Sequence, residues 1–398
     1  MKEVNNPTVP WSGRGSRYTE EEIEAAVTAM READPLTQGR FQGEFEAAFK
    51  DAVGSPHAFA VSSCTAALTL SAVLARLGPD DEVIIPSHTF AATAIPFART
   101  GCRIVWADID ADTFVIAAPS IERLITAKTK AIVVVHLYGL MADMDPIMDL
   151  ARRHGILVIE DAAQSLGATY QGHAAGAIGD MGCFSFHTHK NMSTLGEGGM
   201  LTVADDDLAA AAPGFRHNGM RGYEGERDKY WLPAMSNVDF DWDGQWPFNF
   251  CIGEVQCAVG TAQLARIDAM NADRRERAHR MIAALADYPE MVFQQTPAGR
   301  ENVFYCLPAR YDGNPAGATR DDFMERMAFH HKVKMVVQYY PLNRYPMFEK
   351  AGFGDADCPE TDRFYDRMVS FPFHHWMPES EFDYMIEATR ETLEALRQ

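Results

Sequence analysis

A single lysine, Lys190, stands in the segment of this 398-residue chain with the densest chemical signal, GCFSFHTHKNMSTLGEGGM over residues 182–200. A lone lysine is usually a solvated charge. Here, however, residues 184–186 predict a buried strand that ends at His187, and the glycine-rich residues 196–199 let the backbone pass close to a bulky planar ligand. Partial desolvation would lower the pKa of the Lys190 amine and make it a nucleophile. A cofactor that binds as a Schiff base requires such an amine.

The elements that must position this lysine alternate between strand and helix. Short apolar, β-branched runs predict buried strands, and helical periodicity separates them. We predict strands over 57–62, 82–86, 103–108, 131–136 and 156–161, and helices over 65–77, 91–100, 119–126 and 145–154. This alternation predicts an α/β fold with helices on both sides of a mostly parallel sheet. Because ligands bind beyond the carboxyl ends of such strands, we expect His136, Asp161 and the loop after Phe90 on one side of the sheet.

The pattern changes after about residue 253. A long helical stretch over 254–287 precedes predicted strands near 303–311, 333–338 and 369–373 and helices near 319–331 and 378–397. These features predict a second, smaller α+β domain. We therefore expect an N-terminal arm (1–18), a large domain (19–260) and a small C-terminal domain (261–398). The large domain should open with a helix over 19–31, where Thr19 and Glu22 have capping-box spacing.

Residues 219–248 form an unusual stretch. They contain Trp231, Trp242 and Trp246, half of the chain's six tryptophans, and have little periodicity. Such a stretch suits a lid or a long active-site loop, and it equally suits a dimer contact. Composition does not separate these alternatives.

The composition excludes several classes of protein. With 36 Lys and Arg against 56 Asp and Glu, the formal net charge is −20, which argues against nucleic acid or an anionic membrane as the main partner. No apolar run approaches the roughly 18 residues of a membrane span, and the polar N-terminus is no signal peptide. The seven cysteines are scattered without CxxC pairs, which predicts reduced thiols and a cytoplasmic protein.

Five segments carry a family resemblance: SSCTAAL (62–68), PSHTF (86–90), EDAAQSLGA (160–168), FSFHTHK (184–190) and GEGG (196–199). In order and spacing the chain resembles the sugar aminotransferases of the DegT/DnrJ/EryC1/StrS family. The resemblance runs from about Leu36 to the C-terminus. It implies pyridoxal 5'-phosphate (PLP) as cofactor and the aspartate-aminotransferase fold, the PLP-dependent transferase fold type I.

The resemblance also implies roles around the PLP ring. Lys190 matches the Schiff-base lysine, which holds the cofactor and then moves a proton. Asp161 matches the acid that keeps the pyridine nitrogen protonated, although a turn residue or helix cap would suit its place as well. Phe90 matches the aromatic that stacks on the ring, and Gln164 matches a residue on the oxygen side of the ring. An isolated Phe is more often core, and Gln164 could be a plain loop amide.

A second set of matches concerns the phosphate. Cys64 and Thr65 begin a helix whose backbone N–H groups and dipole suit an anion, although Thr65 is also a good N-cap. Ser185 matches a hydroxyl on the same phosphate. Asn249 matches an asparagine that reaches the phosphate from the partner subunit, which implies a homodimer with active sites at its interface.

We expect no metal site. His187 and His189 could be read as a metal-binding pair, but no carboxylate or cysteine lies at the usual ligand spacing. The pairs at 330–331 and 374–375 are more often surface or packing histidines. The glycines form no GxGxxG after a strand, so a dinucleotide site is not expected.

The chain departs from the family at two places. The family's Asn-Tyr-Arg-Met is Asn-Phe-Cys-Ile over 249–252, so an arginine associated with the reaction centre is missing. Arg216, Arg221 and Arg344 are candidate replacements. The family's His-Tyr-x-Pro-Leu-His becomes Gln-Tyr-Tyr-Pro-Leu-Asn over 338–343, which removes both histidines. These departures leave recognition of the amino donor and of the acceptor open.

The resemblance implies a transaminase of amino-sugar biosynthesis. It would transfer the amino group of L-glutamate or L-glutamine to a keto sugar, which we expect to be a nucleotide-linked keto-deoxy sugar. One alternative is a PLP-dependent sugar dehydratase of the same superfamily, but those enzymes carry histidine where this chain has Lys190. The other is a non-catalytic PLP-binding regulator, which the missing arginine keeps open.

Overall fold

The computed structural model describes residues 4–220, 229, 231, 242 and 244–398. Most of the predicted loop over 219–248, with Arg221, lies outside the described residues. Within the described part of the chain, no helix combines the length and apolarity needed to cross a bilayer.

A seven-stranded sheet forms the centre of the molecule, in the order β1-β9-β8-β5-β4-β2-β3. The strands are β1 (His57–Val61), β2 (Glu82–Pro86), β3 (Arg103–Ala107), β4 (Thr129–Val135), β5 (Leu157–Asp161), β8 (Met181–Ser185) and β9 (Gly199–Val203). From β3 through β8 all neighbours are parallel, whereas β9 pairs antiparallel with both β8 and β1. The predicted mostly parallel sheet is therefore confirmed.

Helices cover both faces of this sheet, as its apolar strands predict. One face packs against α2 (Arg40–Val53), α5 (Ala118–Leu124), α6 (Met144–His154) and α8 (Glu254–Leu264). The other packs against α3 (Cys64–Leu74), α4 (Ile95–Ala98), α7 (Asp206–Arg216) and α11 (Pro346–Lys350). Along β4, Ile132 and Val134 face the first cluster, whereas Ala131 and Val133 face the second. This alternation is the period of two that a buried strand requires.

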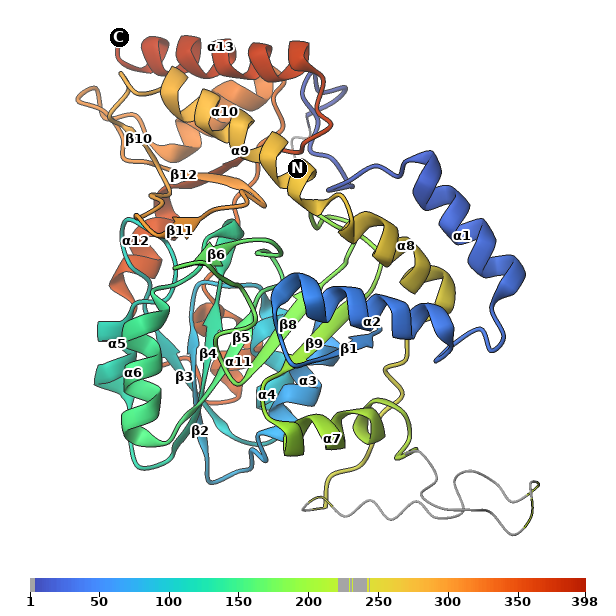
Figure 1. Ribbon diagram of the computed structural model, residues 1–398. Coiled ribbons are helices and arrows are strands. Elements are labelled where there is room, and N and C mark those ends of the chain that lie inside the picture. The colour runs from blue at the N-terminus through green and yellow to red at the C-terminus, as the bar shows by residue number, and fades with distance from the viewer. Residues whose placement is uncertain (1–3, 221–228, 230, 232–241, 243) are drawn as a thin grey trace.

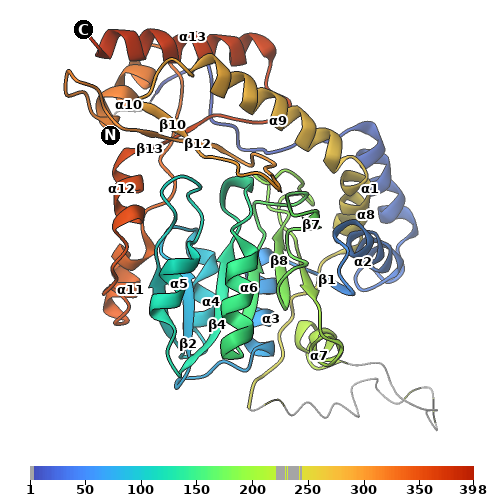
Figure 2. The same ribbon diagram turned by 60° about the vertical axis from the view of Figure 1, so that its left-hand side comes forward.

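A smaller antiparallel sheet lies beyond one end of the large sheet (Figures 1 and 2). It contains β10 (Met291–Phe293), β12 (Leu307–Tyr311) and β13 (Met368–Phe371). Its core includes side chains of α9 (Ile267–Ala284), α10 (Arg320–Phe329) and α13 (Glu379–Leu396). A third small sheet joins β6 (Thr169–Tyr170), β7 (His173–Ala174) and β11 (Arg300–Glu301).

Two predicted elements differ from the structure. The stretch over 254–287 is two helices, because Arg266 leaves helical geometry and its guanidinium binds Glu22 at 2.5 Å. The segment 333–338 is no strand, because Val333 and Val336 make single bridges to different partners, Val9 and Ser370. At the start of α1 (Glu20–Glu32) the expected capping contact is present, since Thr19 N–H donates to the Glu22 carboxylate at 2.6 Å.

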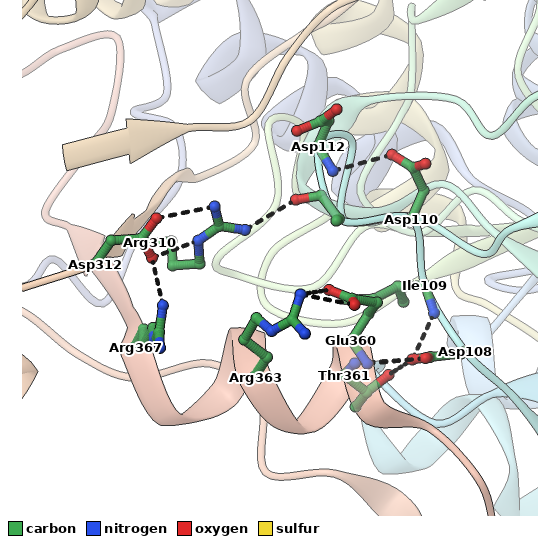
Figure 3. A network of polar contacts seen from close by, with 11 residues as sticks. Asp108, Ile109, Asp110, Asp112, Arg310, Asp312, Glu360, Thr361, Arg363 and Arg367 are labelled. Carbon is green, nitrogen blue, oxygen red and sulfur yellow. Dashed lines mark hydrogen bonds and ion pairs between the residues drawn. The ribbon is translucent and has the colours of Figure 1, made fainter. Parts of the chain in front are cut away.

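A polar network fastens the C-terminal part of the chain to the loop after β3 (Figure 3). The buried Asp108 carboxylate accepts hydrogen bonds at the start of α12 (Pro359–Arg367), from Glu360 N–H at 2.9 Å and from Thr361 N–H and Oγ1 at 2.8 Å each. From β12, Arg310 donates to the Ala111 carbonyl at 3.2 Å. These contacts fix the position of α12 relative to the large sheet.

Replacing Asp108 with alanine is expected to lower the free energy of unfolding by about 2–4 kcal/mol, because it leaves several buried donors without an acceptor. Denaturant unfolding followed by circular dichroism measures the change. Asp112→Ala is the matched control, since Asp112 is exposed on the same loop. Equal stability of the two variants would contradict the anchoring role of Asp108.

Candidate active site

A cavity of about 410 Å³ lies at the carboxyl ends of the parallel strands, with Val135, Asp161 and Ser185 in its wall. The start of α3, residues 89–93, the N-terminal residues 11–15 and parts of the C-terminal region line it as well. This is the edge at which the sequence predicts a ligand. His136 directly follows β4 at the same edge, as expected, and its N–H donates to the Asp161 carbonyl at 3.1 Å. Its side chain is buried and does not line the cavity, and its Nε2 lies 2.7 Å from the Glu160 carboxylate.

Lys190 follows β8 and lines this cavity, as predicted. Its side chain is half-buried, and its Nζ lies 4.6 Å from the centre of the Tyr305 ring. Desolvation lowers the pKa of the amine, although the thiol of Cys64 and the carboxylate of Asp161 oppose the shift. A lower pKa leaves more of the amine neutral and nucleophilic near neutral pH.

Asp161 ends β5 and lines the same cavity, with only 4% of its surface exposed. One carboxylate oxygen accepts from Thr93 Oγ1 at 2.7 Å and the other from Ala163 N–H at 3.1 Å. Burial raises the pKa of this carboxyl, and the hydrogen bonds only partly oppose it. A cation placed against Asp161 would therefore stabilise its ionised form.

Phe90 and Gln164 also line the cavity. Phe90 is 56% exposed, and its ring centre lies 5.8 Å from that of Tyr339. The Gln164 amide is not a plain loop amide, because it accepts from Tyr138 N–H at 2.8 Å and donates to Tyr339 Oη at 3.1 Å. Gln164 therefore holds Tyr339, which lies in the segment that departs from the family.

One part of the cavity wall suits an anion. Cys64 and Thr65, in the first turn of the eleven-residue helix α3, line the cavity, and so does Ser185. The N-cap is Ser63 and not Thr65, because Ser63 Oγ accepts from Ala66 N–H at 3.1 Å. Gly199 packs against this turn, where an added Cβ would lie 2.5 Å from the Ser63 carbonyl carbon. The helix N-terminus and the hydroxyls suit a phosphate.

Asn249 does not line this cavity; it is exposed, and its Oδ1 accepts only a long bond from Cys251 N–H at 3.4 Å. Two of the arginines considered as replacements bind elsewhere. Arg216 pairs with Glu46 at 2.5 Å, and Arg344 pairs with Asp362 at 2.5 Å. Neither lines the cavity of its own chain.

Several residues that line the cavity were not predicted as site residues. They come from the N-terminal segment and from the C-terminal part of the chain: Trp11, Ser12, Arg14, Tyr305, Cys306, Phe373 and His374. His374 stacks on Trp376 with ring centres 3.6 Å apart, and burial lowers its pKa to about 3. Gly15 is the one local signal that the N-terminal segment approaches another backbone closely, because a Cβ there would lie 2.1 Å from the Lys190 carbonyl oxygen.

The cavity's chemistry fits PLP. An exposed aromatic ring, a buried carboxylate, a desolvated amine and a helix N-terminus match the planar ring, the pyridine nitrogen, the aldehyde and the phosphate of PLP. The described residues include no cluster of three or more His, Cys, Asp or Glu that could hold a metal ion. His187 and His189 both line the cavity, and His187 lies 3.7 Å from the Glu197 carboxylate.

Comparison with known proteins identifies the family. Residues 17–390 match the DegT/DnrJ/EryC1/StrS aminotransferase family. The spore coat polysaccharide biosynthesis protein SpsC of Bacillus subtilis is 35% identical over 93% of this chain and 94% of its own. GDP-perosamine synthase of Caulobacter vibrioides is 37% identical over 89% of this chain and 91% of its own.

The fold comparison agrees. The crystal structure of the aminotransferase TlmJ from Streptoalloteichus hindustanus has a TM-score of 0.86 and 28% identity, covering 98% of this chain and all of TlmJ, 100%. Aminotransferases of this family use PLP, which confirms the expected cofactor. The match to the TlmJ structure confirms the expected fold type I architecture. The chain therefore belongs to the DegT/DnrJ/EryC1/StrS aminotransferase family and is a PLP-dependent transaminase.

Proposed function

We propose that this enzyme moves the amino group of L-glutamate or L-glutamine to the ketone of a nucleotide-linked keto-deoxy sugar, in the cytoplasm. One observation carries the proposal: the Lys190 amine and the buried Asp161 carboxylate line one cavity of about 410 Å³. The Caulobacter relative is named for a GDP-linked sugar, which supports a nucleotide-linked acceptor. All seven cysteines are free, which supports a reducing compartment.

Each predicted site residue that lines the cavity has a role around the bound cofactor in this proposal. Bound PLP supplies an electron-withdrawing ring that makes the donor's Cα–H acidic. Lys190 would hold the cofactor through its amine and, once the donor's amine has displaced it, would carry the proton away from the donor's Cα. Asp161 would keep the ring nitrogen protonated, and Phe90 would cover one ring face. Gln164 would bind the oxygen side of the ring, while Cys64, Thr65 and Ser185 would hold the phosphate.

We also propose the division into an arm over 1–18, a large domain over 19–260 and a small domain over 261–398. The small sheet supports the division, because it packs with α10, α13 and the C-terminal half of α9 in a cluster of its own. Within the proposed small domain, α11 packs against the large sheet instead. In this arrangement the cavity draws its walls from all three parts. Closure of the small domain would then exclude water from the reacting groups.

A transfer experiment tests the reaction. PLP-loaded protein is incubated with ¹⁵N-labelled L-glutamate and a panel of nucleotide-linked keto sugars, and the products are analysed by mass spectrometry. A transaminase yields an amino sugar that carries the label. A dehydratase would release water without incorporating label, and a regulator would leave every sugar unchanged; either result would overturn the proposal.

We propose that the enzyme is a homodimer in which Asn249 reaches the phosphate of the partner's cofactor. Support comes from its exposed position outside the cavity of its own chain. Asn249→Ala is expected to weaken PLP binding about 10- to 100-fold, because a hydrogen bond to a charged group is lost. Fluorescence titration of the cofactor-free protein measures this, and light scattering should still show a dimer.

The matched variant Asn249→Asp places a negative charge at the same position. It is expected to bind PLP more weakly than Asn249→Ala, because like charges repel. PLP binding at the level of the parent in both variants would contradict a contact between residue 249 and the phosphate.

A further inference from the structure

The N-terminal segment is fastened directly beside Lys190. Gly15 N–H donates to the Thr188 carbonyl at 2.8 Å. The buried Arg274 donates to the Gly15 carbonyl at 2.8 Å, and it also binds the carbonyls of Phe304 and Tyr305. A Cβ at residue 15 would lie 2.1 Å from the Lys190 carbonyl oxygen, so only glycine fits there. Arg14, the neighbour of Gly15, is thereby held in the wall of the cavity that contains Lys190.

Arg14 differs from the chain's other candidate arginines. Apart from Lys190, it is the sole arginine or lysine among the described residues that line the cavity. Its side chain is exposed, and no ion pair joins it to any other described residue. By contrast, Arg17 on the same segment stacks on Trp376, with its guanidinium 4.1 Å from the ring centre. Arg14 thus presents a cation that has no anionic partner within the described chain.

We propose that Arg14 binds the α-carboxylate of the amino donor, an inference that rests on the proposed transamination. The donor's amine and α-carboxylate share one carbon, so a donor whose amine meets the cofactor at Lys190 holds its carboxylate close to that position, inside the cavity that Arg14 lines. The guanidinium fork matches the two oxygens of one carboxylate. A nucleotide diphosphate carries more negative charge, and Asp161 and Glu197 in the same cavity would oppose it. Arg14 would thus supply the guanidinium that is missing at Cys251, where the family has an arginine.

The first half of the reaction isolates the donor from the acceptor. PLP-loaded protein is mixed with L-glutamate without any sugar, and the conversion of bound PLP to pyridoxamine phosphate is followed by absorbance. In Arg14→Met the donor concentration for half-maximal rate is expected to rise about 10- to 100-fold, since a charge-assisted contact is lost. Arg14→Lys should fall between Arg14→Met and the parent, and Arg17→Met should behave like the parent.

A second donor and a non-reacting ligand sharpen the test. L-glutamine shares the α-carboxylate but not the side-chain charge, so Arg14→Met should weaken both donors equally. Binding of 2-methyl-L-glutamate, which has no Cα proton to lose, should weaken by the same factor in calorimetry. This binding tests Arg14 even if the parent fails to convert PLP, a failure that would sink the proposed function separately.

Three results would overturn the assignment. One is that Arg14→Met and the parent reach half-maximal rate at the same donor concentration. Another is a loss restricted to L-glutamate, which would assign Arg14 to the side-chain carboxylate. The third is weaker binding of UDP and GDP in Arg14→Met with unaltered 2-methyl-L-glutamate binding, which would assign Arg14 to the acceptor.

Discussion

Lys190→Ala is expected to abolish the visible-edge absorbance of bound PLP and to lower turnover by roughly 10,000-fold or more. The variant loses the nucleophile that holds the cofactor and the base that moves the proton, and general acid–base catalysis alone is worth about 100- to 10,000-fold. The surroundings of this amine explain the size of the effect. Desolvation lowers its pKa, and the described cavity residues include no second lysine that could replace it.

Two measurements separate this effect from misfolding. Borohydride treatment of the PLP-loaded parent, followed by peptide mass spectrometry, should place the reduced cofactor on Lys190 and on no other lysine. Lys190→Arg keeps a cation of similar length that does not act as a nucleophile, and it should fold as stably as the parent while remaining inactive. Partial rescue of Lys190→Ala by a small added amine would support the base role. Residual turnover near the parental level would refute the assignment.

The site residues that lie at the ends of strands of the large sheet could be predicted from the sequence. Asp161 ends an apolar run, and such runs mark buried parallel strands whose carboxyl ends face ligands. Lys190 follows directly after another buried run, so its side chain also reaches that edge. Both predictions use local patterns only, because each residue and the strand that positions it lie within a few positions of one another.

The walls contributed by distant segments could not be predicted in this way. Arg14 and Tyr339 line the same cavity as Lys190 only after the whole chain has folded, and neither lies in a periodic element of its own. The strand β9 was not predicted, because it begins at Gly199, the last residue of the glycine-rich run over 196–199, and glycine is a poor strand former.

The exact first residue of α3 could not be predicted from the sequence either. Ser62, Ser63 and Thr65 all carry hydroxyl groups suited to an N-cap, and propensity does not choose among them. The structure selects Ser63, whose Oγ accepts from Ala66 N–H, and this choice leaves the Thr65 side chain free on the cavity side. A shift of two residues in a helix boundary therefore changes which hydroxyl can reach a ligand.

The second large effect is expected at Asp161. Asp161→Ala should weaken PLP binding and slow the proton shift at the donor's Cα, each by roughly 100- to 1,000-fold, because removing one partner of a buried ion pair costs about 3–5 kcal/mol. The ring would lose its protonated nitrogen and with it much of its capacity to withdraw electrons. Fluorescence titration measures the affinity, and the half-reaction with L-glutamate measures the proton shift.

Asp161→Asn separates charge from shape. The amide can still accept from Thr93 Oγ1, which donates to Asp161 at 2.7 Å in the parent, so the pocket should keep its form while losing the negative charge. Burial raises the pKa of the Asp161 carboxyl in the cofactor-free protein, whereas pairing with a pyridinium would lower it. PLP affinity of the parent should therefore fall as the pH drops through that raised pKa, and Asp161→Asn should lack this dependence. If the two proteins share one pH profile and one rate, then the ring nitrogen does not face Asp161, and the cofactor must bind in another orientation.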